Sequence, residues 1–292
     1  MVLCLRMNLR TFNYKLSRAA GHHQAGRLDI AVRQYEKLWD ANPNHAELCH
    51  LLGLAYFQQN KPREAEVLLN SALRLNPEAP AIWHRRLGLV LTAIGDLHGA
   101  KSVHATAAKM SNDAQDWRLL AQACQAMGDP LEALKHLRKG VEVSPNEALG
   151  WAELGFAYQT IGRYSEAGQC HAEAIKLEPK GLPQRLGYGQ VLQQLCQIPE
   201  AIAEYCKILV DHPDLGYAKS HILVASNYLE PSADKLAEQH RAYGREISIR
   251  AQRTIPPTLG SKLNVGILSP DLRAHSCAYF LEPLLDFLPS GI

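Results

Sequence analysis

A 34-residue period runs through most of the chain and is the feature that most constrains its fold. Trp83, Trp117 and Trp151 follow one another at this spacing. Five prolines lie at the same interval or at twice that interval, with Ser111 in the one vacant place: Pro43, Pro77, Pro145, Pro179 and Pro213. A unit of this length cannot bury its apolar face alone, so successive units must stack. The sequence therefore predicts a mainly α-helical solenoid in which each unit contacts its neighbours.

Within each period, residue types recur at places that suit two antiparallel helices. Small residues mark where the first helix approaches the second: Gly53, Gly88, Ala121, Gly155 and Gly189. Large residues are expected to fill the gap to the neighbouring units: Trp83, Trp151, Tyr56 and Tyr158. The recurring proline ends the second helix, because it has no backbone N–H to donate. Pro62 and Pro130 fit the first turn of the second helix, where the amide would be unpaired anyway.

The succession of Trp, Leu-Gly, Tyr, Ala and Pro at this period resembles the tetratricopeptide repeat. The resemblance implies a right-handed superhelix of helix pairs. After an N-terminal tail at 1–11, six units occupy 12–213, at about 12–45, 46–79, 80–113, 114–147, 148–181 and 182–213. The first unit has Lys15 at the Trp place and is interpreted as a cap. In the third unit Trp83 and Gly88 are five residues apart, against four from Trp151 to Gly155, which predicts one extra residue in its first helix and a shorter loop.

Stacked helix pairs of this kind form a groove lined by the first helix of each unit. Such grooves bind extended peptides or partner helices, so the expected partners are proteins or peptides. The alternative is an ordinary solvated helix face. The residues predicted near the groove are polar and mildly basic as a set: His50, Arg85, Arg118, Gln122, Glu153 and Gln190.

Charge and composition argue against several other classes of protein. The formal net charge is +2 with both signs interspersed, so a nucleic-acid surface is not expected. No apolar run reaches the length of about 18 residues that a membrane span needs. The seven cysteines are dispersed and form no CxxC pair, which favours reduced thiols and a cytoplasmic protein. His22 and His23 are interpreted as surface residues rather than metal ligands, because no third ligand is evident.

After Pro213 the period fails and the pattern changes. Residues 214–252 are predicted to form a helical bridge, with two helices in 221–248 and Ser232 as the N-cap of the second. Residues 253–262 are a linker rich in Pro, Gly, Ser and Thr. In 263–292 the run LNVGIL predicts a buried strand, SPDLRAHS a loop, and the residues from Ser276 a helix. Such a unit opens many doubly wound domains, in which ligands sit at the carboxyl end of the strand.

The bridge, the Pro-Pro linker and the segment KLNVGILSPDLRAHSCAYFLEPLL resemble the protein O-GlcNAc transferase family and its Spindly-type relatives. The resemblance implies a catalytic part of two Rossmann-like halves of the GT-B type. UDP-N-acetylglucosamine would bind between them as the donor, and a Ser or Thr of a protein substrate would accept the sugar. The resemblance also places His275 at the active site. From the residues alone, His275 is a loop or cap histidine.

Residues 263–292 offer one strand and one helix, whereas a stable sheet needs about three strands or more. We therefore expect the start of a truncated catalytic domain, with no cofactor bound by this chain and no transferase activity of its own. The first hypothesis is the N-terminal part of an O-GlcNAc-transferase-like glycosyltransferase whose repeats bind protein substrates. The alternative is a stand-alone repeat scaffold for protein–protein interaction, and a split enzyme completed by a second polypeptide ranks third.

Overall fold

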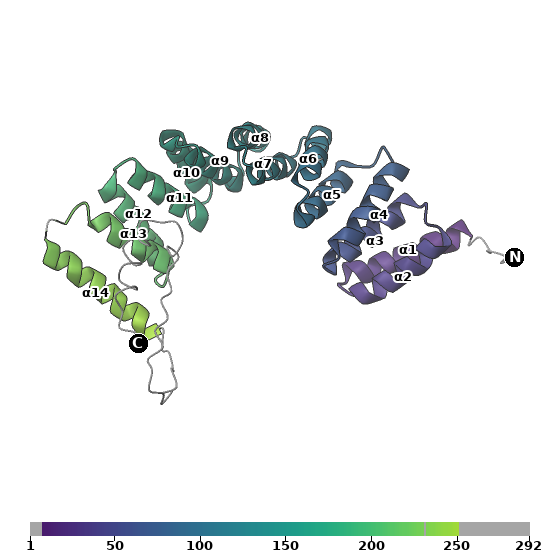
Figure 1. Ribbon diagram of the computed structural model, residues 1–292, viewed down its shortest axis with the longest axis horizontal. Helices are drawn as coiled ribbons and strands as arrows, with labels where there is room; N and C mark the ends of the chain where they lie inside the picture. Colours follow the sequence, from purple (N-terminus) through teal and green to yellow (C-terminus); the bar gives the residue numbers. More distant parts are fainter. Residues whose placement is uncertain (1–7, 231, 251–292) are drawn as a thin grey trace, which may run out of the picture. The chain divides into compact units, whose positions relative to one another are not determined.

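The computed structural model describes residues 8–230 and 232–250, and these residues form fourteen α-helices and no strand (Figure 1). The odd-numbered helices are α1 (Leu9–Gln24), α3 (Ala46–Gln58), α5 (Ala81–Ile94), α7 (Ala114–Ala126), α9 (Ala148–Thr160), α11 (Leu182–Gln194) and α13 (Gly216–Ser226). The even-numbered helices are α2 (Leu28–Ala41), α4 (Pro62–Leu75), α6 (Leu97–Ser111), α8 (Pro130–Val143), α10 (Tyr164–Leu177), α12 (Ile198–Asp211) and α14 (Ala233–Arg250).

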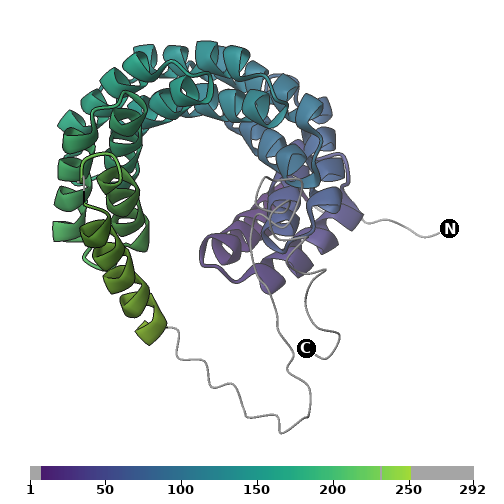
Figure 2. The ribbon, with the colours of Figure 1, turned by 60° about the vertical axis from the view of Figure 1, so that its left-hand side comes forward.

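Up to α12, each odd-numbered helix packs on the even-numbered helix that follows it, and each even-numbered helix packs on the next odd-numbered one. The helices thus form two layers, which Figure 2 shows for this part of the chain. Some odd-numbered helices also contact each other directly across successive pairs: α1 with α3, α3 with α5, and α9 with α11. The odd-numbered layer is therefore the more closely spaced of the two layers, as the predicted solenoid requires.

Each helix pair is closed by a small residue on the odd helix that faces a large buried residue on the even helix. The small residues are Ala19, Gly53, Gly88, Ala121, Gly155 and Gly189, and the large residues at matching places are Tyr35, Leu69, His104, Leu137, His171 and Tyr205. A Cβ at Gly155 would lie 2.8 Å from the His171 ring, and one at Gly189 would lie 2.8 Å from the Tyr205 ring. The prediction that small residues stand where the two helices meet is confirmed.

Helix ends follow the predicted proline signals. α2, α4, α8, α10 and α12 each end two residues before the recurring proline, and Pro62 and Pro130 are the first residues of α4 and α8. The turn inside each pair uses a residue with positive φ: Gly26, Asn60, Gly95, Gly128, Gly162 and Cys196. Glycine adopts this conformation without steric cost, whereas Cys196, at φ 57°, pays a penalty there.

The third pair carries the predicted irregularity. α5 has 14 residues, whereas α3, α7, α9 and α11 have 13. α6 has 15 residues, whereas the other even-numbered helices of the array have 14. Only Asn112 and Asp113 then separate α6 from α7, and Asn112 ends the helix with φ 48°. The extra residue in the first helix, α5, is confirmed. The second helix, α6, also has one extra residue, and the loop between α6 and α7 is shorter than predicted.

The array also departs from the predicted boundaries at both ends. α1 begins at Leu9, three residues before the predicted start of the first unit at 12. After Pro213, α13 packs on α12, and the Lys235 N–H donates to Ser232 Oγ at 3.4 Å, which confirms Ser232 as a cap of α14. The boundary between two compact units of the chain falls between Leu236 and Ala237, within α14. The predicted linker, the strand–loop–helix unit at 263–292 and His275 lie outside the described residues.

Candidate functional site: the face of the odd-numbered helices

Two of the predicted groove residues, Arg85 and Arg118, form ion pairs between successive odd-numbered helices. Arg85 on α5 reaches Asp116 on α7, with Nε 2.5 Å from Oδ1 and Nη2 2.8 Å from Oδ2. Arg118 on α7 pairs with Glu147 and lies with its Nε 3.2 Å from Glu153 Oε2 on α9. The Asp116 side chain is fully buried, so Arg85 neutralises a charge that water cannot reach. Both arginines join neighbouring pairs, and their role in binding a peptide stays a prediction.

Glu153 and Gln122 belong to the same junction. Gln122 Nε2 donates to Glu153 Oε1 at 3.4 Å. Burial raises the pKa of the Glu153 carboxyl, although the Arg118 guanidinium opposes the shift. Gln122 itself is exposed on this face, whereas Glu153 is held between α7 and α9.

The remaining predicted residues differ in exposure. His50 is buried, and its ring stacks on the Trp83 ring with centroids 4.2 Å apart and planes 8° apart. Burial, with Arg86 nearby, lowers the pKa of His50 to about 3, so the ring is neutral at physiological pH. Its Nε2 lies 3.3 Å from Arg86 Nη1. Gln190 on α11 is half-buried and donates to the Tyr217 hydroxyl on α13, which joins another pair of odd-numbered helices.

A polar bridge recurs along the array and was not predicted. Gln159 Oε1 accepts from His171 Nε2 at 3.2 Å, and Gln159 Nε2 donates to the Gly187 carbonyl of the next odd-numbered helix at 3.4 Å. One period later, Gln193 accepts from the Tyr205 hydroxyl at 3.1 Å and donates to the His221 carbonyl at 3.3 Å. The glutamine therefore ties the large buried residue of its own pair to the following pair.

His23 occupies the corresponding place in the first pair. Its Nε2 lies 3.0 Å from Gln58 Oε1 on α3, and its Nδ1 lies 3.4 Å from the Tyr35 hydroxyl on α2. His23 is therefore a half-buried residue whose ring contacts both α2 and α3. Among the residues that the structure describes, no group of three or more His, Cys, Asp or Glu is placed to hold a metal ion.

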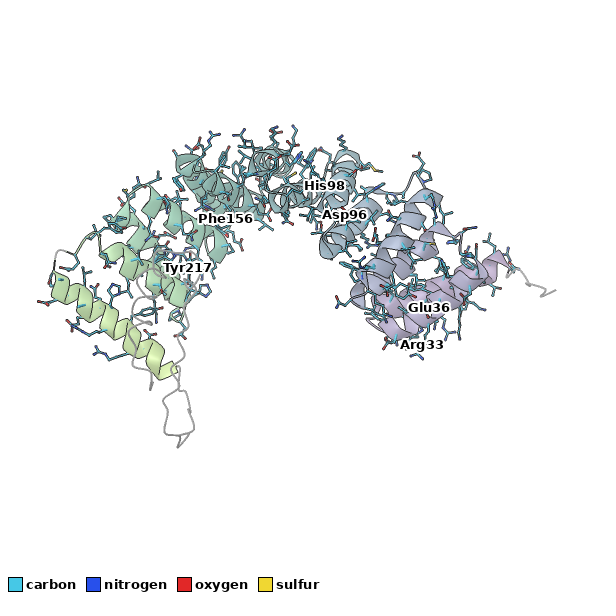
Figure 3. The ribbon with its side chains drawn as sticks, in the orientation of Figure 1. Arg33, Glu36, Asp96, His98, Phe156 and Tyr217 are labelled. Atoms are coloured by element: carbon cyan, nitrogen blue, oxygen red, sulfur yellow. The ribbon has the colours of Figure 1, made fainter. Side chains whose placement is uncertain are left out.

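Large apolar residues on the odd-numbered helices remain exposed, and sequence reasoning missed them. Leu149 and Phe156 on α9, and Tyr217 and Val224 on α13, are each between 37% and 51% exposed. Residues seven apart lie on the same face of a helix, so each helix presents two of these side chains together. Phe156 and Tyr217 are labelled in Figure 3. The missed signal is a double spacing, because 149 and 217, like 156 and 224, are two periods apart.

Polar residues hold both matching places on α7 and one of the two on α11. Gln115 and Gln122 on α7 match Leu149 and Phe156 one period earlier, and both are exposed. Gln190 on α11 stands midway between Phe156 and Val224 in the register. From α7 to α13 one row of this face therefore alternates amide and apolar side chains, namely Gln122, Phe156, Gln190 and Val224. This composition suits contact with a protein segment rather than covalent chemistry.

No helix within residues 8–230 and 232–250 has the length and apolar character that crossing a membrane requires.

Models of the tetratricopeptide repeat match residues 22–87, 114–157 and 148–180. The chain therefore contains tetratricopeptide repeats, and the predicted repeat type is confirmed. The matched segments cover α2 to α4, the first half of α5, and α7 to α10.

Two curated relatives match parts of the chain. Intraflagellar transport protein 70A of Homo sapiens is 28% identical over 111 residues, which is 37% of this chain and 16% of that protein. The SPINDLY protein of Hordeum vulgare, a probable UDP-N-acetylglucosamine–peptide N-acetylglucosaminyltransferase, is 39% identical over 75 residues. That match covers 24% of this chain and 8% of the barley protein. The aligned segments thus span less than a fifth of either relative.

Solved structures share the fold at low sequence identity. The C-terminal part of a repeat-containing protein from Cytophaga hutchinsonii has a TM-score of 0.65 and is 16% identical, covering 80% of this chain and 90% of that one. MamA has a TM-score of 0.53 at 24% identity, covering 56% of this chain and 95% of that one. YrrB is a tetratricopeptide-repeat protein with an unusual peptide-binding site. It has a TM-score of 0.53 at 20% identity, covering 58% of this chain and 88% of that one. These likenesses show a tetratricopeptide-repeat solenoid.

The Arg85–Asp116 pair predicts a loss of stability rather than of binding alone when the arginine is removed. Arg85→Met leaves the buried Asp116 carboxylate without its cation, so we expect the free energy of unfolding to fall by about 3 kcal/mol. Urea denaturation followed by far-UV circular dichroism measures this change. The double variant Arg85→Met/Asp116→Asn should recover most of the loss, because neither charge remains buried alone.

Lys139→Met is the matched control, since it removes an exposed pair with Glu142. Its effect should stay within about 0.5 kcal/mol. An Arg85→Met variant as stable as the wild type would show that Arg85 has no structural role at this junction.

Proposed function

We propose that the chain is an interaction module whose odd-helix face binds a segment of a partner protein. The observation that carries this proposal is the exposure of Leu149, Phe156, Tyr217 and Val224 at matching places on α9 and α13. Large apolar side chains on a surface otherwise closed by ion pairs and amide bridges supply binding free energy when a partner covers them. The tetratricopeptide repeats support the proposal, as does the peptide-binding site named for the structural neighbour YrrB.

The geometry favours a partner segment with apolar and hydrogen-bonding groups in alternation. Gln122 and Gln190 stand one period on either side of Phe156, so amide groups flank its ring along the array. Because the two layers hold the odd-numbered helices in place, the partner rather than the array would undergo most of the ordering on binding.

A peptide-display selection followed by calorimetry tests the proposal. Peptides selected on the wild-type chain should bind Phe156→Ala/Tyr217→Ala at least about tenfold more weakly, because aromatic anchors dominate the binding free energy of such interfaces. Leu131→Ala is the control, since Leu131 is an exposed apolar residue on the even-numbered helix α8.

Phe156 packs edge-on against His171 and Tyr217 packs against His221, so thermal denaturation of each variant is measured alongside binding. Selected peptides that bind the double variant as tightly as the wild type would contradict the proposal.

A second candidate function is the substrate-selecting part of a protein O-GlcNAc transferase, with His275 at the active site of the complete enzyme. The 39% identity with the barley SPINDLY protein and the SPDLRAHS run favour it. UDP-N-acetylglucosamine would then be the donor, and the protein bound along the repeats would carry the accepting Ser or Thr.

This candidate makes a specific prediction for the chain itself. Residues 263–292 are too few to enclose a nucleotide, so incubation with UDP-N-acetylglucosamine and a Ser/Thr peptide should release no UDP above the uncatalysed background. A coupled UDP assay measures this. Release of UDP that depends on the peptide, and that His275→Ala abolishes, would contradict the expected inactivity.

A further inference from the structure

A cleft on the first two helix pairs lies between even-numbered helices and is separate from the face proposed above. It has a volume of about 550 Å³ and is lined by residues of α2, α3 and α4. The residues that matter for its chemistry are Glu36, Trp39, Asp40, Tyr56, Glu64 and Val67. Glu36, Trp39 and Asp40 come from α2, and Glu64 and Val67 come from α4, with Tyr56 of α3 between them. Figure 3 labels Glu36 on α2.

The floor and walls of the cleft are apolar and in part open to solvent. Val67 is 65% exposed and Trp39 is 38% exposed, whereas Leu52 and Leu68 are buried beneath them. A tryptophan ring and a valine side chain on two separate helices give a concave surface that an apolar side chain can fill.

The rim of the cleft is negatively charged. Glu36, Asp40 and Glu64 all line it, and within the described residues no Lys or Arg nitrogen lies within 4.0 Å of their carboxylates. Buried and half-buried carboxylates elsewhere in the array do have a cationic partner, since Asp116, Glu153 and Glu204 each face an arginine. The three cleft carboxylates therefore have unused capacity for a cation.

The hydroxyl of Tyr56 lies close to the same negative charges. Its hydroxyl donates to Glu36 Oε1 at 2.8 Å. Burial first, then the bond to Glu36 and the charges of Glu36, Glu64 and Asp40 raise the pKa of Tyr56 to about 12. Lys61 Nζ lies over the Tyr56 ring, 5.4 Å from its centroid. A cation is thus already tolerated over this ring, at a distance typical of a cation–π contact.

We propose that this cleft binds a partner segment that carries a lysine or arginine beside a large apolar residue. The apolar residue would cover Trp39 and Val67, and the cationic group would lie among the carboxylates of Glu36, Asp40 and Glu64. Charge complementarity selects this occupant, because an acidic segment would be repelled and a purely apolar one would leave the carboxylates without a partner. The site lies on helices that do not include α9 or α13, so it stands independently of the proposed odd-helix interface.

The test uses the full chain and three blocked tripeptides in an NMR titration: acetyl-Leu-Lys-Leu-amide, acetyl-Leu-norleucine-Leu-amide and acetyl-Leu-Glu-Leu-amide. The indole N–H resonance of Trp39, assigned by its loss in Trp39→Phe, is the readout. We expect the lysine peptide to shift this resonance saturably, and its apparent Kd to rise as salt is increased. The norleucine and glutamate peptides should bind several-fold more weakly.

Glu36→Gln/Glu64→Gln should weaken the lysine peptide by about five- to tenfold, since an ion pair that water reaches adds only about two- to threefold to the affinity. Glutamine still accepts the Tyr56 hydrogen bond, so the fold of the cleft is kept. Glu66→Gln removes the same charge from α4 outside the lining residues and is the matched control. Phe156→Ala should leave the titration unchanged.

Four results would overturn the proposal. One is equal affinity for all three peptides, and another is unaltered binding of the lysine peptide by Glu36→Gln/Glu64→Gln. The third is the absence of a saturable Trp39 shift up to about 10 mM peptide. A Trp39 shift that depends on protein concentration without peptide would instead identify a second copy of the chain as the occupant, and would likewise overturn it.

Discussion

The contact between a small residue on each odd-numbered helix and a large buried residue on its even-numbered partner is the interaction on which the rest of the structure depends. Gly155 against His171, and Gly189 against Tyr205, bring two helices close enough that no Cβ fits between them. Two closely packed helices bury little alone, so the large residue also has to meet the next pair, as His171 does at Gly187. One contact thus closes the pair and starts the stacking. It also explains why a histidine can stand where other pairs have leucine or tyrosine, since burial lowers the pKa of His171 to about 4 and keeps the ring neutral.

Polar contacts then fix how successive pairs are placed. The Gln159 and Gln193 bridges repeat at one period, and the arginine pairs of Arg85 and Arg118 hold the middle of the array. Most of the polar side chains that the sequence predicts for ligand binding are therefore engaged in contacts within the array. What remains on the odd-helix face is largely apolar or amide, which is why the proposed interface rests on Phe156 and its neighbours rather than on the charged residues.

The period was enough to predict the helix pairs, their proline ends and the glycine contacts, because these depend on steric rules that act within one unit. Partners of long side chains could not be predicted in the same way. Arg85 was placed on the correct helix, but its pairing with Asp116 joins side chains of two different helix pairs, which the pattern within one unit does not reveal. Arg185 stands one period after Trp151, and a cation at a tryptophan place should have prompted a search for its carboxylates, Glu204 and Asp211. The predicted strand and His275 lie outside the described residues and stay predictions.

The stability of Gly155→Ala tests the central contact most directly. The added Cβ would lie 2.8 Å from the buried His171 ring, so we expect the free energy of unfolding in urea to fall by about 1–3 kcal/mol. Gly21→Ala, in α1 with no atom within 4 Å of the new Cβ, should instead raise it by about 0.5–1 kcal/mol. Adding His171→Leu to Gly155→Ala copies the Ala121–Leu137 pair of the preceding repeat and should restore most of the loss. A Gly155→Ala variant that is stabilised as much as Gly21→Ala would contradict the account. The two helices would then have room for a Cβ at position 155, and their close approach there would not depend on glycine.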